Sequence, residues 1–309
     1  MQPMFRKFHL FSYLGLILLF LAILAFDDWL KSVEVRSDGP ARQANVRFSP
    51  VPFEPSGFAP LRLAGVWRVD VDDPRFGGVS ALAIDGKELI ALTDSGTVIR
   101  LPRPGHGSMA SLRDLPAGPG IAQLKVNRDS EALARDPAGR GWWVAFEQWH
   151  QLWLYDAGFR RALRKIDLGR NRWPDNRGIE AMAAEGSGLV LFPEPGGEWL
   201  RLGDGHLRSH RLANAFGNLS DAARLPDGRL LLVTRQFGPT GIAKHLVLAR
   251  PTAQGLVLRD VAALGLGATD NVEGIAAEPR DDGGTRLWVV TDNDFRPRKA
   301  TLLLALDLP

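Results

Sequence analysis

Acidic residues recur at one place in a repeated pattern, and their type and spacing suit the binding of a cation. Four short apolar runs carry a carboxylate near their start, and a fifth carries a serine there. These five residues are Ser80, Glu131, Glu180, Asp221 and Glu273. A second polar residue stands at the end of the next apolar run. The second set comprises Asp94, Glu147, Glu194, Arg235, and Asp292 together with Asp294.

The two sets of polar residues are expected to meet at one face of the molecule. Their separation is 14 residues in three of the five copies. In a β-hairpin, the start of the first strand and the end of the second lie side by side. Carboxylates brought together in this way repel one another, which raises their pKa values unless a cation intervenes. Oxygen ligands of this kind suit Ca²⁺ or, as the alternative, Mg²⁺.

Neutral and basic side chains accompany these acids. Four asparagines close to the acids would add neutral oxygen ligands: Asn127, Asn176, Asn218 and Asn271. Three arginines occur at related positions of the repeat. Arg128 and Arg177 directly follow two of the asparagines, and Arg235 replaces the second acid in the fourth copy. Arginine binds phosphate through two parallel hydrogen bonds, so a cation and an anionic substrate could share the site. Two alternatives stay open: the arginines pair with the carboxylates, and the polar residues merely satisfy loop amides and keep a channel hydrated.

The residues that must position these side chains form short β-strands. Each copy reads as an apolar strand, a glycine-containing turn and a second apolar strand, and a third strand often follows. The copies begin at Gly77, Asp129, Asn176, Asn218 and Asp270. Runs such as "ELIALT" and "RLLLVT" are too short for helices and are bounded by turn residues. Such runs are typical of buried strands.

The repeat predicts an all-β fold, a β-propeller. Successive copies start between 40 and 52 residues apart, which is the size of a propeller blade. Five repeat units are visible, so we expect five blades, or six if the segment 103–125 holds an irregular one. The strand-like run "PLRLAGVWRVD", residues 60–70, should pair with the C-terminal blade and close the ring. A two-sheet sandwich is the alternative architecture.

The composition excludes several classes of function. The chain has 309 residues, of which 45% are hydrophobic, so it can bury a sizeable core. It has no cysteine, which excludes disulfides, thiolate metal sites and a cysteine nucleophile. Its net charge of +3 falls to +1 outside residues 1–26, and no run of basic residues is interleaved with aromatics. A nucleic-acid partner is therefore not expected.

The N-terminal segment has the pattern of a targeting element. Arg6 and Lys7 precede 17 uncharged residues, Leu10–Phe26. That length is at the lower limit for crossing a bilayer. We expect residues 1–26 to be a signal or membrane anchor and residues 27–59 to be a proline-rich tether. Residues 60–309 would then form an extracytoplasmic, periplasmic domain, either anchored to the membrane through the N-terminal segment alone or released after cleavage.

Several motifs together resemble those of the phytase-like family with esterase-like activity. They are "GGVSALAIDGKELIALTDSG", "NRGIEAMA", "LLVTRQF" and "DNVEGIAAEP" followed by "LWVVTDNDF". The resemblance covers about residues 60–309. It implies an exported β-propeller with calcium-assisted phosphoesterase or esterase activity.

The motifs and the resemblance lead to a specific hypothesis. The protein would be a monomer that hydrolyses a phosphoric or carboxylic ester of a small, anionic or ester substrate at the channel mouth. The expected calcium ligands are Asp94, Glu131, Glu180, Asn271, Glu273, Asp292 and Asp294. The expected catalytic residues are Arg177, Glu180, Arg235 and Glu273, with the two arginines holding the substrate anion. The alternative is a non-catalytic propeller that binds a ligand or a protein.

Overall fold

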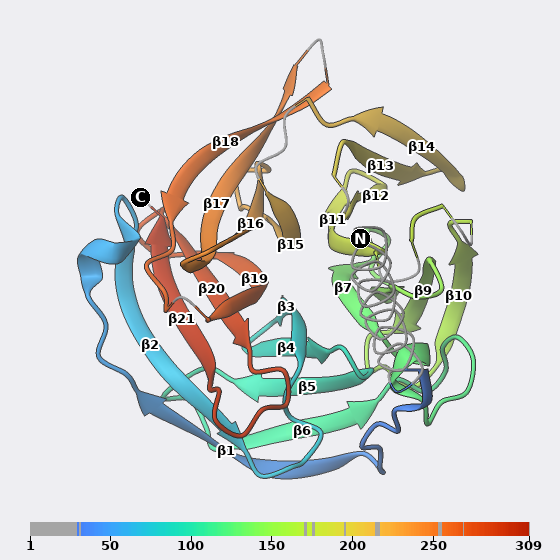
Figure 1. Ribbon diagram of the computed structural model, residues 1–309, viewed down its shortest axis with the longest axis horizontal. Coiled ribbons are helices and arrows are strands. Elements are labelled where there is room, and N and C mark those ends of the chain that lie inside the picture. Colours follow the sequence, from blue (N-terminus) through green and yellow to red (C-terminus); the bar gives the residue numbers. More distant parts are fainter. Residues whose placement is uncertain are drawn as a thin grey trace, which may run out of the picture.

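The described residues form five four-stranded blades, of which three are separate sheets and two belong to one nine-stranded sheet. The blades are arranged around a common axis (Figure 1). The computed structural model describes residues 30, 32–169, 172–174, 177–194, 196–213, 217–252, 255–267 and 269–308. The first strand of each blade is the innermost. The prediction of a β-propeller is confirmed, and the part of the chain that the structure describes contains five blades.

The first four blades are antiparallel sheets whose strands follow one another in the sequence. Blade 1 contains β3 (Val79–Asp85), β4 (Glu88–Thr93), β5 (Thr97–Pro102) and β6 (Met109–Asp114). Blade 2 contains β7 (Ser130–Arg135), β8 (Gly141–Phe146), β9 (Gln151–Asp156) and β10 (Ala162–Asp167). Blade 3 contains β11 (Ile179–Glu185), β12 (Gly188–Pro193), β13 (Glu198–Gly203) and β14 (His206–Arg211). Blade 4 contains β15 (Asn218–Arg224), β16 (Leu230–Gly238), β17 (Gly241–Thr252) and β18 (Gly255–Ala263).

The fifth blade joins the two ends of the chain. It contains β19 (Asn271–Pro279), β20 (Thr285–Asp292), β21 (Thr301–Leu308) and the N-terminal strand β2 (Arg62–Val71). Strand β2 pairs antiparallel with β21, with Trp67 opposite Leu303. The predicted closure of the ring by an N-terminal strand is therefore confirmed. The segment 103–125 forms no sixth blade, because it supplies β6 and the loop that leads to the short helix η2 (Lys125–Asn127).

The residues expected to form a tether are partly built into the fold. Strand β1 (Arg42–Pro50) pairs with β2 on one side and with β6 on the other, which links blades 5 and 1 into a nine-stranded sheet. A short helix, η1 (Pro55–Phe58), follows. The expectation of an extended tether was wrong for residues 42–58, because apolar residues such as Val46 and Phe58 are buried there despite the prolines.

The predicted signal or anchor, residues 1–26, lies outside the described residues. Within the part of the chain that the structure describes, no helix is long and apolar enough to cross a membrane.

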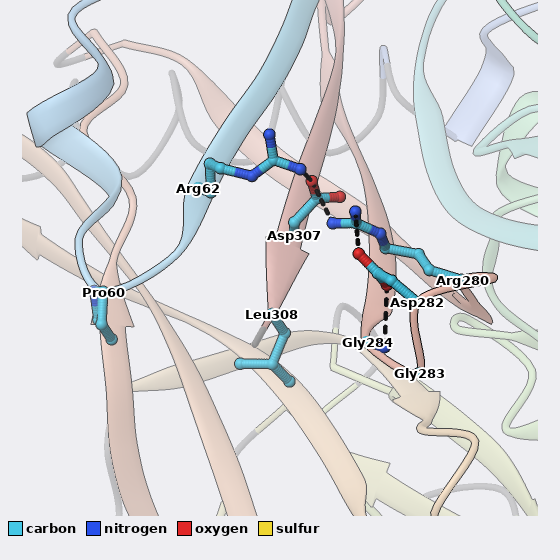
Figure 2. A pocket seen from close by; sticks show the side chains of 8 residues that line it. All are labelled: Pro60, Arg62, Arg280, Asp282, Gly283, Gly284, Asp307 and Leu308. Atoms are coloured by element: carbon cyan, nitrogen blue, oxygen red, sulfur yellow. Dashed lines mark hydrogen bonds and ion pairs between the residues drawn. The ribbon is translucent and has the colours of Figure 1, made fainter.

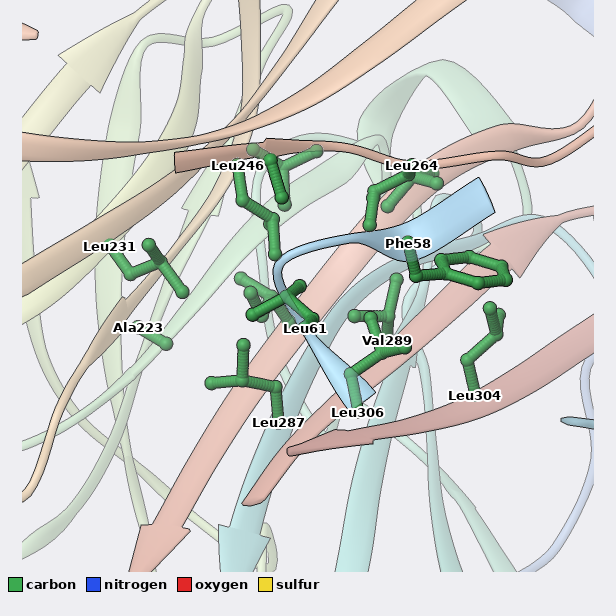
Figure 3. Packing of buried hydrophobic residues seen from close by; sticks show 14 of the residues in the cluster. Phe58, Leu61, Ala223, Leu231, Leu246, Leu264, Leu287, Val289, Leu304 and Leu306 are labelled. Carbon is green, nitrogen blue, oxygen red and sulfur yellow. The ribbon is translucent and has the colours of Figure 1, made fainter. Parts of the chain in front are cut away.

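Apolar side chains fill the spaces between neighbouring blades. Between blades 4 and 5, η1 inserts Phe58, which is fully buried, against Leu264 and Leu304 (Figure 3). Burial of a phenylalanine contributes about 2–3 kcal/mol, so the segment before β2 also stabilises this junction. The packing between blades fixes the five inner strands side by side around the axis, and their polar ends form the candidate site.

Candidate functional site

A β-bulge occurs at the same place in all five inner strands. In each case one residue has no partner in the pairing with the second strand of the blade. The unpaired residues are Ser80, Glu131, Glu180, Ser220 and Glu273. A bulge bends the strand and redirects the side chain at that point. The repeated bulge therefore gives equivalent places to a set of side chains that includes three of the predicted acids.

In four blades the second polar residue ends the second strand or directly follows it, and in blade 4 Arg235 lies within β16, opposite Asn218. The members of the second polar set are Asp94, Glu147, Glu194, Arg235 and Asp292. Backbone hydrogen bonds hold three of them beside the inner strand of the same blade. The N–H of Glu147, for example, donates to the carbonyl oxygen of Asp129 at 2.9 Å, and the N–H of Glu194 donates to that of Gly178 at 2.9 Å. The predicted meeting of the two sets is thus found within each hairpin.

We call the resulting group of acids the mouth cluster. Its nine carboxylates are Asp94, Asp129, Glu131, Glu147, Glu180, Glu194, Glu273, Asp292 and Asp294. Five basic side chains pair with members of this cluster among the described residues: Lys125, Arg177, Arg235, Arg296 and Lys299. Nine acids against five bases leave an excess of negative charge, which favours the binding of a cation.

Arg235 is the basic residue most deeply embedded in the mouth cluster. Its side chain is 8% exposed, and it forms ion pairs with Glu273 and, at 3.7 Å, with Glu180. It also donates a hydrogen bond of 3.0 Å to Oδ1 of Asn271, which in turn donates to Glu273. Arg235 therefore already neutralises part of the charge from blades 3 and 5, and the oxygen of Asn271 is engaged with it.

Two groups of three carboxylates have the spacing of a metal site. In the first group, oxygens of Asp129, Glu131 and Glu147 lie within 4.8 Å of one another. In the second, oxygens of Glu147, Glu180 and Glu194 do so. Glu147 belongs to both groups, and no described basic residue forms an ion pair with Glu131 or Glu147. Carboxyl groups without a basic partner are therefore found between blades 2 and 3.

Burial raises the pKa values of these carboxyls, because the charged form loses its hydration. The pKa of Glu147 rises to about 10, chiefly through burial and then through the charges of Asp129 and Glu180. The pKa values of Glu131 and Glu180 also rise well above their usual range, again mainly through burial. Without a cation, protons must therefore neutralise part of this charge.

The carboxylates of blades 1 and 5 differ from those of blades 2 and 3, because a lysine forms an ion pair with each of the two groups. Lys125 approaches Asp94 at 2.9 Å, yet burial raises the pKa of Asp94 to about 7. Lys299 pairs with Asp294 at 3.0 Å. Burial raises the pKa of Asp292 to about 9, and a hydrogen bond from Asp292 lowers that of Asp294, so this pair shares a proton.

Several residues of the predicted site lie elsewhere or are engaged in structural contacts. Asp221 was predicted to belong to the ring of acids, but Ser220 occupies the bulge. The carboxylate of Asp221, which is fully buried, instead accepts hydrogen bonds from the backbone N–H groups of Ala222, Ile275 and Leu82, at 2.7, 2.7 and 3.4 Å. It therefore connects the inner strands of blades 4, 5 and 1.

Two residues from the loop between blades 1 and 2 also form contacts within the protein interior. Asn127 donates to the carbonyl oxygen of Ile121 and accepts from the indole of Trp149, so its side chain is used in the loop. Arg128 donates to the carbonyl oxygens of Pro119 and Asn127. Arg177, by contrast, is half exposed and lies 3.8 Å from Glu194 at the edge of the cluster. Asn176 lies outside the described residues.

Four members of the site were absent from the predicted ligand set. Glu147 and Glu194 carried a recognisable signal, because they occupy the same hairpin position as Asp94 and Asp292. Asp129 lies two residues before the bulge, where Asn218 and Asn271 stand in blades 4 and 5, so the repeat could also have revealed it. Lys125 comes from the loop between blades 1 and 2, and nothing in the repeat indicates it.

Another pocket lies at the opposite end of blade 5 from Asp292 and contains no member of the mouth cluster. It is about 550 Å³ in volume and lies beside Arg62, Arg280 and Asp307 (Figure 2). Asp307 pairs with both of these arginines and with Arg286. Arg62 of β2 and Arg286 of β20 both pair with the buried Asp307 of β21, so these contacts help to hold the three strands together.

The fold and the acidic channel mouth define this protein as a β-propeller with a candidate cation site on its axis. Residues 74–295 match the family model "Phytase-like", described as esterase-like activity of phytase. The match spans more than half of the chain, and the chain belongs to this family.

Comparisons with solved structures give matches at 14% sequence identity or below. Glutaminyl cyclase from Myxococcus xanthus superposes with a TM-score of 0.50 at 14% identity, over 88% of this chain and 100% of the other. Virginiamycin B lyase from Staphylococcus aureus gives 0.43 at 12% identity, over 80% and 70%. Hydrazine synthase from Kuenenia stuttgartiensis gives 0.39 at 14% identity; the match covers 72% of this chain and only 58% of that one. No curated protein matches the sequence.

Proposed function

We propose that this protein is a calcium-assisted hydrolase of phosphoric or carboxylic esters that acts at the mouth of the propeller channel. The observation that carries the proposal is the pair of carboxylate groups between blades 2 and 3, which share Glu147. Membership of the phytase-like family supports the same class of reaction.

The donor set fits a hard cation. All candidate ligands are carboxylate oxygens, and those of each group lie within 4.8 Å of one another. Calcium binds oxygen at about 2.3–2.6 Å, so two ligands on opposite sides of one ion are about 5 Å apart. Magnesium, which binds at about 2.1 Å in a nearly ideal octahedron, is the alternative. Calcium is proposed because it accepts six to eight oxygen ligands in less regular arrangements.

Five carboxylates would hold the cation: Asp129, Glu131, Glu147, Glu180 and Glu194. A bound divalent cation supplies a Lewis acid that polarises an ester oxygen and lowers the pKa of a coordinated water. This set extends the predicted ligands Glu131 and Glu180 to their neighbours in blades 2 and 3. Five other residues were also predicted as ligands but lie outside the two groups of three carboxylates, so they are not placed in this set: Asp94, Asn271, Glu273, Asp292 and Asp294.

Arg177 and Arg235 would have different roles toward the substrate. Arg177 is the better candidate to bind the substrate anion, because its side chain is half exposed and its ion pair with Glu194 is long, at 3.8 Å. Arg235 faces the same cluster but is held by Glu180 and Glu273. Glu273 thus orients Arg235, whose guanidinium would stabilise negative charge that develops on the reacting group.

We also propose that the protein works outside the cytoplasm. The support is the order of the N-terminal residues, in which Arg6 and Lys7 precede the uncharged Leu10–Phe26. Basic residues that flank an apolar segment tend to stay in the cytoplasm, which would place the propeller on the other side. Cell fractionation of the full chain checks this location.

Turnover of chromogenic substrates tests the hydrolase directly. The wild-type chain is assayed with p-nitrophenyl phosphate and p-nitrophenyl acetate in calcium and in EDTA, beside Glu147→Gln. We expect hydrolysis that requires calcium and a loss of about 100-fold or more in kcat/KM for the variant, since several kcal/mol of charge stabilisation depend on the cation. Glu88→Gln, on the exposed end of β4, is the matched control and should keep wild-type activity. Absence of turnover under every metal condition would refute the proposal.

A non-catalytic binding propeller is the second candidate function. The observation in its favour is that Arg235 is already neutralised by two glutamates, which leaves little basic charge for a substrate anion. A calcium-dependent rise in the midpoint of thermal unfolding without turnover would support this candidate.

A further inference from the structure

Most of the exposed large apolar side chains lie at one end of the propeller. Among the described residues, eight large apolar side chains are exposed. Four of them lie at the end that carries the mouth cluster, which we call the mouth face: Val35, Ile121, Phe237 and Phe295. Leu30 and Val33 precede the segment that attaches there, and Met109 and Leu163 lie at the opposite end, the far face, where β6 and β10 begin. Exposed apolar side chains concentrated on one face are typical of a surface that binds a protein or a membrane.

The segment before β1 is fixed to the mouth face. The backbone N–H of Lys125, whose side chain pairs with Asp94, donates to the carbonyl oxygen of Glu34 at 2.9 Å. Val35 follows, and its side chain is 70% exposed. A pocket of about 600 Å³ is lined by Val35, Phe295 and Asp94. The exposed apolar side chains therefore border the mouth cluster itself.

Blade 4 extends furthest on the mouth face. In blade 2, the pairing of the second and third strands ends with Phe146 opposite Gln151. The pairing of β16 with β17 continues for four residue pairs beyond the equivalent position, up to Gly238 opposite Gly241. Four residues of a strand span about 14 Å. This extension carries Phe237, which is 64% exposed, beyond the mouth cluster.

The chain before Glu34 connects the mouth face to the predicted signal or anchor. The uncharged segment Leu10–Phe26 ends eight positions before Glu34. Eight residues span at most about 28 Å when fully extended. While the uncharged segment is held in a bilayer, the mouth face therefore stays close to the membrane surface.

The distribution of the apolar side chains suits a wide, flat partner. Ile121 and Val35 come from the loop between β6 and β7 and the segment beside it, Phe237 from the hairpin of β16 and β17, and Phe295 from the loop between β20 and β21 (Figure 1). Arg296 directly follows Phe295, and its side chain is 74% exposed, with a long ion pair of 3.9 Å. Apolar and basic side chains side by side are typical of segments that bind the interface of a bilayer.

We propose that the mouth face docks onto the lipid bilayer that holds the N-terminal segment. Val35, Ile121 and Phe237 enter the interface between headgroups and acyl chains, and Arg296 faces lipid phosphates. The channel mouth thus opens toward the membrane, and the far face points away from it. This orientation does not depend on the proposed hydrolysis.

Fluorescence quenching by lipids tests the orientation. The chain has no cysteine, so a single label can be placed at a chosen position. Ile121→Cys and Phe237→Cys carry the fluorophore NBD on the mouth face, and Met109→Cys and Leu163→Cys are matched controls with similar exposure on the far face. Each full-length variant is reconstituted into vesicles of phosphatidylcholine and phosphatidylglycerol, with and without a lipid that bears a nitroxide near its headgroup.

The labels at positions 121 and 237 should lose most of their fluorescence in the nitroxide vesicles. The labels at positions 109 and 163 should keep theirs, because strands of six residues place the far face about 20 Å further from the bilayer. Ile121 and Phe237 lie in separate elements, so if circular dichroism shows that one variant is unfolded, the other still provides the test.

Four outcomes would overturn the assignment. They are the absence of quenching at positions 121 and 237, equal quenching on both faces, recovery of the full chain in the vesicle-free fraction, and a blue-shifted emission of the mouth-face labels without quenching. The last outcome would assign the mouth face to a second copy of the chain or another protein. Since no substrate is used, failure here leaves the proposed hydrolase to its own assay.

Discussion

Arg235 has two roles in the mouth cluster: it neutralises buried carboxylates, and in the proposed reaction it stabilises negative charge. It is buried between Glu180 and Glu273, so it compensates their repulsion before any cation arrives. A buried ion pair that loses one partner leaves an uncompensated charge, which is far more costly than the pair itself is stabilising. The contribution of Arg235 to the free energy of unfolding should therefore be measurable in the cation-free protein.

Replacement of Arg235 by methionine should lower the free energy of unfolding by about 3 kcal/mol in EDTA. Calcium should recover part of this loss, because a cation can take over the neutralisation of Glu180. Urea unfolding with and without calcium measures both effects. Arg177→Met is the matched control, and its exposed ion pair should contribute less than about 1 kcal/mol. A cost as small as that of the control would show that Arg235 is not needed to balance the cluster.

Asp221 should matter for stability rather than for cation binding. Its removal in Asp221→Ala leaves backbone N–H groups of three inner strands without their acceptor, at about 1–3 kcal/mol for each buried group. We expect the free energy of unfolding to fall by about 3 kcal/mol, and by less in Asp221→Asn, which keeps one oxygen. Calorimetric titration with calcium should give the wild-type affinity for both variants. A loss of calcium binding without loss of stability would contradict the structural role.

At the scale of elements, the repeated bulge explains what the sequence could and could not predict about the site. The acids of β7, β11 and β19 were predicted, since a carboxylate at a strand start is visible in the sequence. In β15, the residues Ser220 and Asp221 both fit the pattern, and the bulge decides between them. Spacing along the chain does not reveal which of two neighbouring residues has no partner in the sheet.

Strand β19 requires a glycine directly after its bulge. A Cβ on Gly274 would lie 2.6 Å from Val290 and 2.8 Å from Leu82, because β19 packs closely against β3 at this point. We expect Gly274→Ala to lower the free energy of unfolding by about 1–3 kcal/mol through overpacking. Gly203→Ala, with open space around its Cβ, is the control and should change stability by less than about 1 kcal/mol. Equal stability of the two variants in urea would exclude the close contact.

For the molecule as a whole, the mouth cluster predicts a dependence of stability on pH. Glu147 and Asp292 titrate near 4.5 and 3.8 when unperturbed and at about 10 and about 9 in the folded, cation-free protein. The folded state then binds more protons than the unfolded state between these values. The stability contributed by these protons is present below about pH 4 and is lost as the pH rises toward 9 and 10.

Calcium should therefore stabilise the protein more at pH 8 than at pH 5, because cations replace protons on the same carboxylates. Scanning calorimetry in EDTA and in calcium at both pH values measures the difference. In EDTA, the unfolding midpoint should fall between pH 5 and pH 8, and Glu147→Gln should show a smaller fall. A calcium-induced rise of the same size at both pH values would mean that calcium binds elsewhere.

The propeller fold could be predicted from the sequence, whereas the outer strands of the blades could not. The inner strands carry buried apolar runs, and their repetition predicts a propeller closed by residues 60–70. The outer strands β10 and β14 are largely exposed, with sequences such as "HLRSHR" that have no apolar periodicity. Strand β1 escaped prediction for a related reason, since neighbouring prolines suggested an extended tether and its partners β2 and β6 are distant in sequence.

Because β2 completes blade 5, it must wait during synthesis until its partner strand β21 has been made. Strand β2 ends at Val71, and Leu308, the last residue of its partner β21, lies 237 positions later in the chain. At about 5–20 residues per second, the ribosome makes that length in about 10–50 s. During this interval β2 can pair only with β1, and its other edge stays open to foreign strands. The nascent chain is therefore expected to depend on chaperones until its last strand emerges.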